Sequence, residues 1–146
     1  MSLRDGTAKM SKSDPSDQAT IYLKDSPDDI AKKIKRAKTD PEPLPSEPAG
    51  LENRPEAANL VGIYAALSGK SDEDILKEFG GKGFGAFKPA LADLVASKLG
   101  PVGAELKRLE ADPAFLEKTL KAGAEKAAAV ADRVVAEVKD IVGFIR

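Results

Sequence analysis

PEAANLVGIYAALSG, residues 55–69, has the composition and the spacing of one complete α-helix. Proline suits the first helical position because its missing N–H is not needed there, and a glycine commonly follows the last helical residue. Apolar side chains recur on one side of this helix, at Leu60, Val61, Tyr64 and Leu67. The pattern predicts a helix that packs against its neighbours through one face.

Helical patterns recur in the rest of the chain. Ser26 can cap a helix that begins with a proline, and Ile30, Ile34 and Ala37 then share one face. Further helices are predicted over residues 71–79, over residues 86–109 with a kink at Gly100–Pro101, and over residues 114–142 with an irregularity at Gly123. No strand-like alternation is long enough to support a sheet. We therefore expect an all-α fold, a helical bundle preceded by a loop.

The segment between residues 39 and 55 is rich in proline, which excludes regular secondary structure there. Its five prolines are Pro41, Pro43, Pro45, Pro48 and Pro55. We interpret it as a linker or a surface-hugging loop that lacks the composition of a core segment. The chain then divides into residues 1–20, residues 21–54 with a connecting helix and the linker, and a helical domain over residues 55–146.

The composition excludes several kinds of chemistry. The chain contains no cysteine and no histidine, so it has no disulfide, no thiolate nucleophile and no Cys-ligated zinc. The commonest general base at neutral pH is also missing. No apolar run approaches the roughly 20 residues of a bilayer span, and the first residues have no secretory signal. We therefore expect a cytoplasmic protein without a metal site of its own.

Positive charge is concentrated at the start of the chain. Residues 1–38 hold nine Lys and Arg against six Asp, a net charge of +3, whereas residues 39–146 hold 14 against 18, a net charge of −4. An anionic ligand is therefore expected near the start. The pentapeptide Lys9-Met10-Ser11-Lys12-Ser13 lies there, and its lysines and hydroxyls can surround an anionic group with hydrogen-bond donors. Taken alone, the pentapeptide could also be a plain solvated loop.

The pentapeptide and its surroundings resemble the C-terminal part of the bacterial-type tryptophanyl-tRNA synthetases, a family of class I aminoacyl-tRNA synthetases. Further landmarks of the resemblance occur in the same order, at residues 1–6, 33–40, 59–64, 81–88 and 123–127. The family's nucleotide-binding fold, its HIGH-type motif and its tryptophan pocket should precede residue 1, since a chain without histidine cannot hold a HIGH motif. The first 20 residues would then end a truncated nucleotide-binding domain.

The resemblance implies a fragment of a tryptophan–tRNA ligase that supplies an ATP-binding KMSKS loop and an anticodon-binding helical domain. Lys9 and Lys12 would be catalytic, and the loop that binds ATP would consist of Lys9, Met10, Ser11, Lys12 and Ser13. The implied partners are tRNA(Trp), tryptophan and ATP with Mg²⁺, in a homodimeric full enzyme. The 146-residue chain alone should be monomeric and inactive. The alternative is a stand-alone helical RNA-binding or regulatory protein derived from that domain.

The first predicted helix carries a basic stripe with two interpretations. Lys32, Lys35 and Arg36 point away from its apolar face, and Lys33 and Lys38 flank them. Such a stripe is either a solvated face or a surface that binds an RNA phosphate backbone.

Two further patterns concern the second half of the chain. A 4-3-4-3 spacing in the last helix suits either packing inside one bundle or a coiled-coil seam, and its members are Ala127, Ala131, Val134, Val138 and Ile141. Phe144 and Ile145 are expected to fold back onto the bundle. The glycine-rich residues 80–85 indicate a turn between helices rather than a phosphate cradle, because the Lys-Ser/Thr pair of a P-loop is missing.

Overall fold

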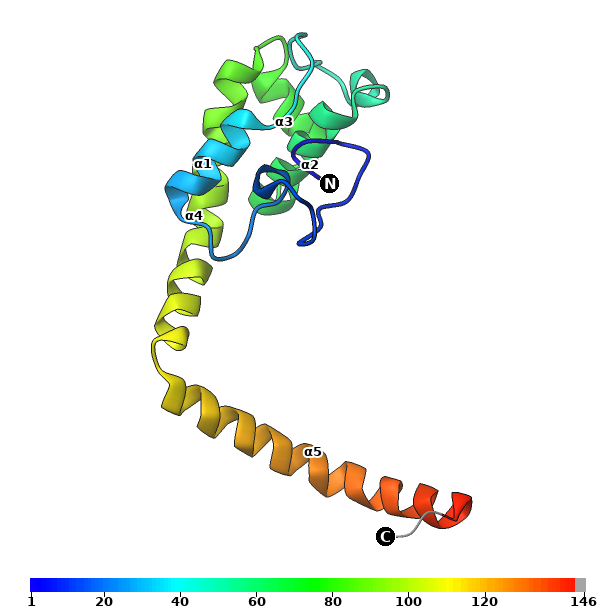
Figure 1. Cartoon of the computed structure of the whole chain (residues 1–146). Helices are drawn as coiled ribbons and strands as arrows, with labels where there is room; N and C mark the ends of the chain where they lie inside the picture. The colour runs from blue at the N-terminus through cyan, green and yellow to red at the C-terminus, as the bar shows by residue number, and fades with distance from the viewer. Residues whose placement is uncertain (144–146) are drawn as a thin grey trace. The chain divides into compact units, whose positions relative to one another are not determined.

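The computed structural model describes residues 1–143 (Figure 1), and every regular element in this range is helical. The 3-10 helices are labelled η and the α-helices α. In chain order they are η1 Asp17–Ala19, α1 Pro27–Arg36, η2 Pro48–Leu51, α2 Pro55–Ser68, α3 Asp72–Phe79, α4 Phe84–Glu110 and α5 Pro113–Val142. No strand occurs among the described residues. The all-α fold class predicted from the sequence is confirmed.

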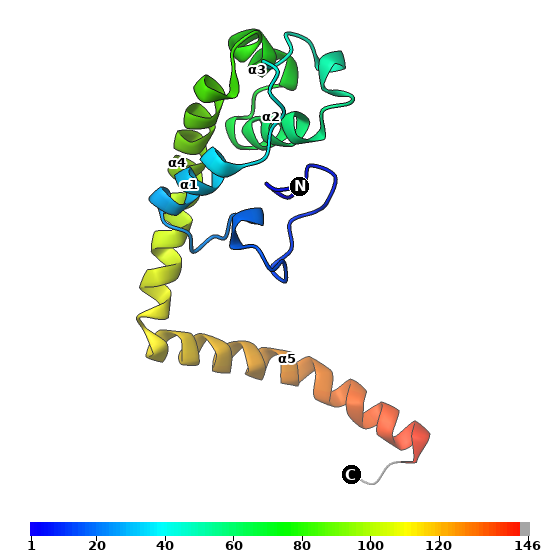
Figure 2. The ribbon, with the colours of Figure 1, turned by 45° about the horizontal axis from the view of Figure 1, so that its top comes forward.

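The chain divides into two compact units, residues 1–104 and residues 105–146. The division falls within α4, and the first unit holds all the helices that precede it. Within this unit α1 lies alongside α4, as two views of the ribbon show (Figures 1 and 2). The domain limits predicted from composition, after residues 20 and 54, refer to parts of a longer protein and stay predictions.

The helices begin and end at the residues that local sequence signals favour. The Ser26 side chain accepts a hydrogen bond from the Asp29 N–H at 3.2 Å, and Ser71 accepts one from the Asp74 N–H at 3.1 Å. These bonds satisfy N–H groups that have no partner within the helix. Gly69 ends α2 in the left-handed conformation, with φ of 74°, which favours glycine. The cap predicted at Ser26 and the stop predicted at Gly69 are confirmed.

The core of the first unit is built around three aromatic rings from α2, α3 and α4. The Tyr64 and Phe79 ring centroids lie 5.6 Å apart edge to face, and those of Phe79 and Phe87 lie 5.1 Å apart. Aliphatic side chains surround the rings, and the fully buried ones are Leu3, Ile30, Ile34, Leu44, Leu60, Val61, Ile75, Leu76, Leu91 and Val95. Burial of this apolar surface is the main force that holds the unit together.

The proline-rich segment contributes to this core. Leu44 is only 1% exposed, and the turn that follows α3 holds its backbone. The Leu44 N–H donates to the Lys82 carbonyl at 3.0 Å, and the Gly81 N–H donates to the Leu44 carbonyl at 2.8 Å. Composition alone did not predict the burial of Leu44, because one leucine among prolines has no periodicity.

Arg54, just before α2, holds the start of the proline-rich segment. Its guanidinium donates to Asp40 through Nε at 3.0 Å and through Nη2 at 2.5 Å. It also donates to the backbone carbonyls of Pro43 and Glu42, at 2.8 and 3.0 Å. Arg54 thus supplies side-chain hydrogen bonds to the first residues of the segment. Residues 48–51 of the same segment form the 3-10 helix η2, so the prediction that prolines exclude regular secondary structure there is wrong for these residues.

The two longest helices run without interruption. α4 continues through Pro89 and Pro101, and the kink predicted at Gly100–Pro101 stays a prediction. α5 likewise continues through Gly123, and the irregularity predicted there is absent. The glycine-rich residues 80–85 form a turn and the first residues of α4, which agrees with the predicted turn between helices.

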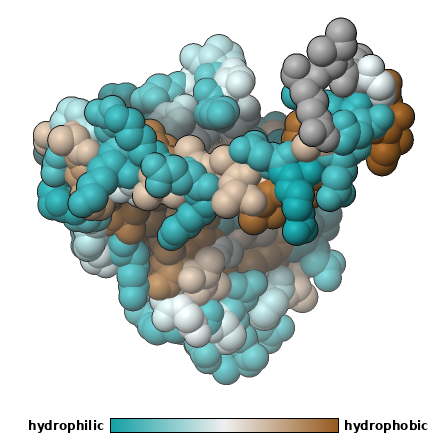
Figure 3. Space-filling view, turned by 90° about the horizontal axis from the view of Figure 1, so that it is seen from below, coloured by the Kyte–Doolittle hydropathy of each residue, from teal (hydrophilic) through white to brown (hydrophobic). Residues whose placement is uncertain are grey.

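No side chain of α5 is buried. Three members of the predicted seam, Val134, Val138 and Ile141, are 49%, 52% and 83% exposed. Hydrophobic residues lie beside hydrophilic ones at the surface in the space-filling view (Figure 3). The expected packing of the seam inside one bundle is therefore not found in the described residues, and the coiled-coil alternative stays a prediction. The expected folding back of Phe144 and Ile145 lies outside the described residues.

Candidate functional site

The segment that carries the pentapeptide is anchored at its two ends. At the first end, Leu3 is buried, its N–H donates to the Ala19 carbonyl at 2.9 Å, and its carbonyl accepts from the Lys38 N–H at 2.8 Å. The Asn59 side chain of α2 donates to the Ser2 carbonyl at 3.0 Å. At the second end, Ala19 is buried together with the residue that follows it. Residues between these anchors form a loop on the surface.

The loop Lys9–Ser13 presents its polar side chains to solvent. Lys9, Lys12 and Ser13 are exposed, whereas Met10 is half-buried and packs against the core. The Ser11 carbonyl accepts the Asp14 N–H at 3.2 Å, which forms a tight turn. The two ammonium groups and the Ser13 hydroxyl are therefore available to an anionic ligand, and Met10 ties the loop to the protein.

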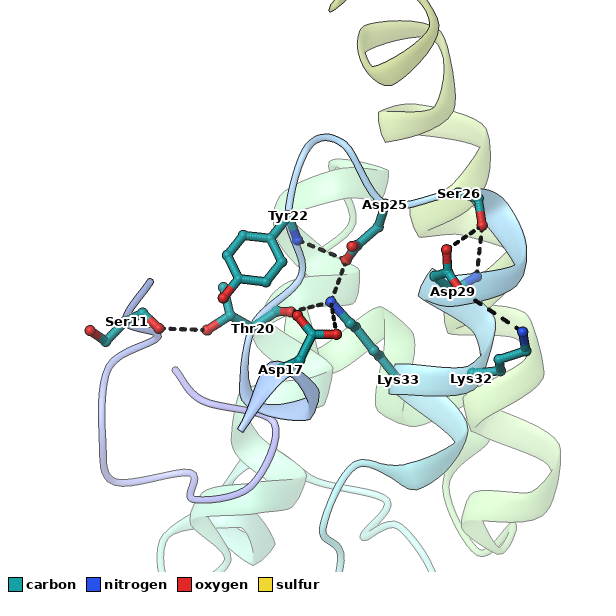
Figure 4. Close-up of polar contacts among 9 residues, drawn as sticks. All are labelled: Ser11, Asp17, Thr20, Tyr22, Asp25, Ser26, Asp29, Lys32 and Lys33. Atoms are coloured by element: carbon teal, nitrogen blue, oxygen red, sulfur yellow. Dashed lines mark hydrogen bonds and ion pairs between the residues drawn. The ribbon is translucent and has the colours of Figure 1, made fainter. Parts of the chain in front are cut away.

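Lys33 is the feature of this region that the sequence did not reveal. It was predicted to flank the exposed basic stripe of α1, but it is 2% exposed (Figure 4). Its ammonium donates to Asp25 Oδ2 at 2.8 Å and to the Thr20 carbonyl at 3.0 Å, and it lies 3.4 Å from Asp17 Oδ2. Since the partners of Lys33 lie 8 or more residues before it, no local pattern could have located them.

The two carboxylates keep Lys33 charged in a buried position. Burial alone would lower the pKa of Lys33, but the hydrogen bond and the charge of Asp25, with a further contribution from Asp17, raise that pKa above its ordinary value. The Tyr22 ring adds a cation–π contact, 4.6 Å from the Lys33 Nζ to the ring centroid. Loss of one partner from such a buried pair costs about 3–5 kcal/mol, because the other charge stays behind unpaired.

A hydroxyl joins this buried cluster to the pentapeptide. Thr20 accepts from Lys33 through its backbone carbonyl, and its side-chain Oγ1 donates to the Ser11 carbonyl at 3.2 Å. Figure 4 shows Ser11, Thr20 and Lys33 connected in this order. The Ser11 carbonyl therefore receives one bond from the turn at Asp14 and one from the residue that Lys33 holds.

The turn that supplies Asp25 packs closely against α4 at Gly103. A Cβ on Gly103 would lie 2.7 Å from the Leu23 carbonyl oxygen, so a side chain there would push the turn away. Asp25 Oδ2 also accepts from the Tyr22 N–H at 2.9 Å and closes the turn. The cluster around Lys33 thus depends on residues from η1, from the turn, from α1 and from α4.

The basic stripe of α1 is exposed as predicted. Ile30 and Ile34 are buried on the inner face, and Lys32, Lys35 and Arg36 are exposed on the outer face. Lys32 lies 3.8 Å from the Asp29 carboxylate, and both side chains are more than half exposed, so this ion pair is weak. Three cations, without Lys33, therefore form the stripe that could bind a phosphate backbone.

Lys88 of α4 caps the carboxyl end of α1 beside a shallow groove. Its ammonium donates to the Ala37 carbonyl at 2.8 Å and to the Thr39 hydroxyl at 3.2 Å, and burial lowers its pKa. The groove, of about 500 Å³, lies between α1 and α4 and is lined by Lys35, Phe84 and other side chains. Lys88 thus satisfies a carbonyl at the carboxyl end of α1 and ties α4 to that end.

The described residues contain neither a metal-binding cluster nor a membrane-spanning helix. Within residues 1–143 no group of three or more Asp and Glu side chains is arranged to hold a metal ion. In the same part of the chain, no helix is both long enough and apolar enough to cross a membrane.

Comparison with known proteins defines the class of protein. Residues 1–100 match the family described as tRNA synthetases class I (W and Y). Since the match covers more than half of the 146 residues, this chain belongs to that family.

Several relatives of this chain are tryptophan–tRNA ligases. The chain is 56% identical over 146 residues to the tryptophan–tRNA ligase of Mesorhizobium japonicum, covering 100% of this chain and 41% of the relative. It is 58% identical over 144 residues to that of Caulobacter vibrioides, covering 99% and 42%. The crystal structure of tryptophanyl-tRNA synthetase from Mycoplasma pneumoniae matches with a TM-score of 0.75 at 27% identity, covering 100% and 45%. The chain thus spans about two fifths of the length of these relatives.

Proposed function

We propose that this chain supplies the ATP loop and an RNA-binding helical region of a tryptophan–tRNA ligase. The observation that carries the proposal is the identity of 56% across all 146 residues to a protein of that name, with the pentapeptide Lys9–Ser13 intact. In such an enzyme the substrates are tryptophan, ATP with Mg²⁺ and tRNA(Trp). Because the chain spans 41% of the length of that relative, we assign the activity to the full-length ligase and not to these 146 residues alone.

The proposed role of the loop is to stabilise charge that develops on ATP. When an amino-acid carboxylate attacks the α-phosphate, pyrophosphate leaves and negative charge builds on it. Lys9 and Lys12 are exposed on one short loop, where their ammonium groups can approach that charge as it forms. Groups that act on the transition state raise kcat, whereas equal binding of substrate and transition state lowers KM alone. A surface loop can also close over ATP and then open to release product.

The proposed test of the loop uses the full-length ligase that contains this segment. Lys9→Ala and Lys12→Ala should each lower kcat of tryptophan-dependent ATP–pyrophosphate exchange by roughly 10²–10³-fold, the effect of one lost transition-state donor. Lys98→Ala, an exposed lysine of α4, is the matched control. An unchanged kcat with a raised KM for ATP would contradict the proposed role. The purified 146-residue chain should give no exchange above a mock preparation.

The proposed role of the α1 stripe is to bind the phosphate backbone of tRNA. Lys32, Lys35 and Arg36 are exposed on one face, and each phosphate that they neutralise should add close to one unit to the salt dependence of binding. In the full-length ligase, the triple change of these residues to Ala should leave tryptophan activation intact and weaken tRNA charging, most visibly at higher salt.

The control for this experiment removes equal charge elsewhere in the same unit. Lys70, Lys77 and Lys98 are exposed on other parts of residues 1–104, and their triple change to Ala should leave charging and its salt dependence unaltered. Aminoacylation by the α1 triple variant that matches the unmutated ligase at all salt concentrations would mean that the stripe is only a solvated face. Anticodon contacts would then have to lie elsewhere in the helical region.

A further inference from the structure

Lys33 is a buried lysine for which the proposed function has no role. Its ammonium holds two carboxylates and one backbone carbonyl, and a buried charge of this kind is costly unless every partner is in place. A lysine that only filled space would be replaced at lower cost by an apolar side chain of similar volume.

The contacts of the cluster lead to the pentapeptide and to the anchor behind it. Lys33 fixes the Thr20 carbonyl, and the Thr20 hydroxyl fixes the Ser11 carbonyl. The neighbouring Ala19 carbonyl accepts the Leu3 N–H, so the same short stretch holds both ends of the loop. The 3.4 Å contact of Lys33 with Asp17 ties η1 to α1 as well.

We infer that Lys33 is a positioning residue. It fixes the anchor at Ala19 and Thr20, and this anchor sets the position of the ATP loop Lys9–Ser13. It acts through Thr20 and does not touch the ligand. Without the ammonium, Asp25 loses its charge partner and the second anchor loosens, while the aromatic core around Phe79 and Phe87 is untouched. The inference rests on the proposed role of the loop, because a loop that did not bind ATP would need no fixed position.

The absence of cysteine permits a direct test of the ammonium itself. Lys33→Cys introduces the only thiol of the chain, and alkylation of that thiolate by bromoethylamine, in denaturant before refolding, displaces bromide and yields a side chain that again ends in an ammonium group. Lys98→Cys, treated in the same way, is the control at an exposed site. Amide hydrogen exchange of the 146-residue chain, measured by NMR without ATP, then reports the order of each segment.

The expected result is a local loosening that the restored ammonium reverses. In Lys33→Cys the amides of Leu3 and Ala19 should exchange at least about tenfold faster relative to the amides of α3, because both the hydrogen bonds and the ion pair of Lys33 are lost. Alkylation should return them to the unmutated rates, and the Lys98 control should change neither set. A uniform change across the loop and α3, or a failure of alkylation to reverse it, would overturn the inference.

A second variant keeps the test decisive if Lys33→Cys does not fold before alkylation. Thr20→Val removes the bond to Ser11 but keeps the carbonyl that Lys33 holds. It should speed exchange of the Asp14 amide, whose acceptor is also Ser11, and leave α3 unchanged. Unaltered exchange at Asp14 would overturn the inference.

The full-length ligase separates this inference from the proposed function. Lys33→Met should lower kcat of ATP–pyrophosphate exchange by roughly 10–100-fold with KM for tryptophan unchanged, since small misplacements of a catalytic group are that costly. If Lys12→Ala has no effect on kcat, the proposed role of the loop fails. If Lys12→Ala lowers kcat and Lys33→Met does not, the positioning role fails alone.

Discussion

Leu44→Ala should destabilise residues 1–104 strongly, although the composition of the segment around Leu44 is typical of a linker. The side chain is 1% exposed and its backbone forms two hydrogen bonds to the turn after α3, which an alanine can keep. The change therefore removes apolar packing alone. A fully buried Leu→Ala change costs about 2–5 kcal/mol, because the transfer free energy is lost and a cavity remains. At about 3 kcal/mol, a unit of this size should melt about 12–24 °C lower.

Tyrosine fluorescence during thermal unfolding is the appropriate assay, because Tyr22 and Tyr64 both lie in residues 1–104 and the chain has no tryptophan. Leu120→Ala is the matched control, since that leucine of α5 is 73% exposed and should change stability by less than about 0.5 kcal/mol. A Tm for Leu44→Ala within about 3 °C of the unmutated chain would refute the reasoning. The proline-rich segment would then be a dispensable linker after all.

Three further predictions concern acid, truncation and close packing. The hydrogen bond from Arg54, opposed in part by burial, lowers the pKa of Asp40. The pair of Asp40 and Arg54 therefore stabilises the folded state fully above the unfolded pKa of the carboxyl, about 3.9, and this stabilisation is lost as pH falls through the lower pKa of folded Asp40. In urea titrations, the free energy of unfolding of Arg54→Met should therefore fall less in acid than that of the unmutated chain. Removal of residues 113–146 should leave the fluorescence-detected Tm within about 2 °C, because α5 buries no side chain; a larger fall would contradict this. Gly6→Ala should cost about 1–3 kcal/mol of folding free energy, because its Cβ would overlap the backbone at the start of α2. Gly62→Ala is the control, since its Cβ meets nothing within 4 Å and should not destabilise the chain. Equal melting temperatures of the two variants would contradict the predicted overlap.

The sequence was sufficient to predict helix ends and helix faces wherever the interactions that determine them are local. The cap at Ser26, the stop at Gly69 and the apolar face of Ile30 and Ile34 all follow from residues within one or two turns of each other. The exposure of Lys32, Lys35 and Arg36 follows from the same periodicity, and so does the all-α class. The pentapeptide and the landmarks around it also carried the resemblance that the family match confirms.

The tertiary structure alone decided which residues of mixed character are buried. Helical periodicity predicted that Lys33 lies at the edge of the solvent-exposed face of α1. Asp17 and Asp25 precede it by 16 and 8 residues and approach it only when the chain has folded. Leu44 joins the core while the turn after α3 holds its backbone, and the sequence pattern around Leu44 contains no such information. The apolar residues of α5 show the reverse case, since a helical spacing that suits a core is exposed in the structure. Amino-acid spacing determines which side chains share a face, whereas burial depends on what distant parts of the chain bring against that face.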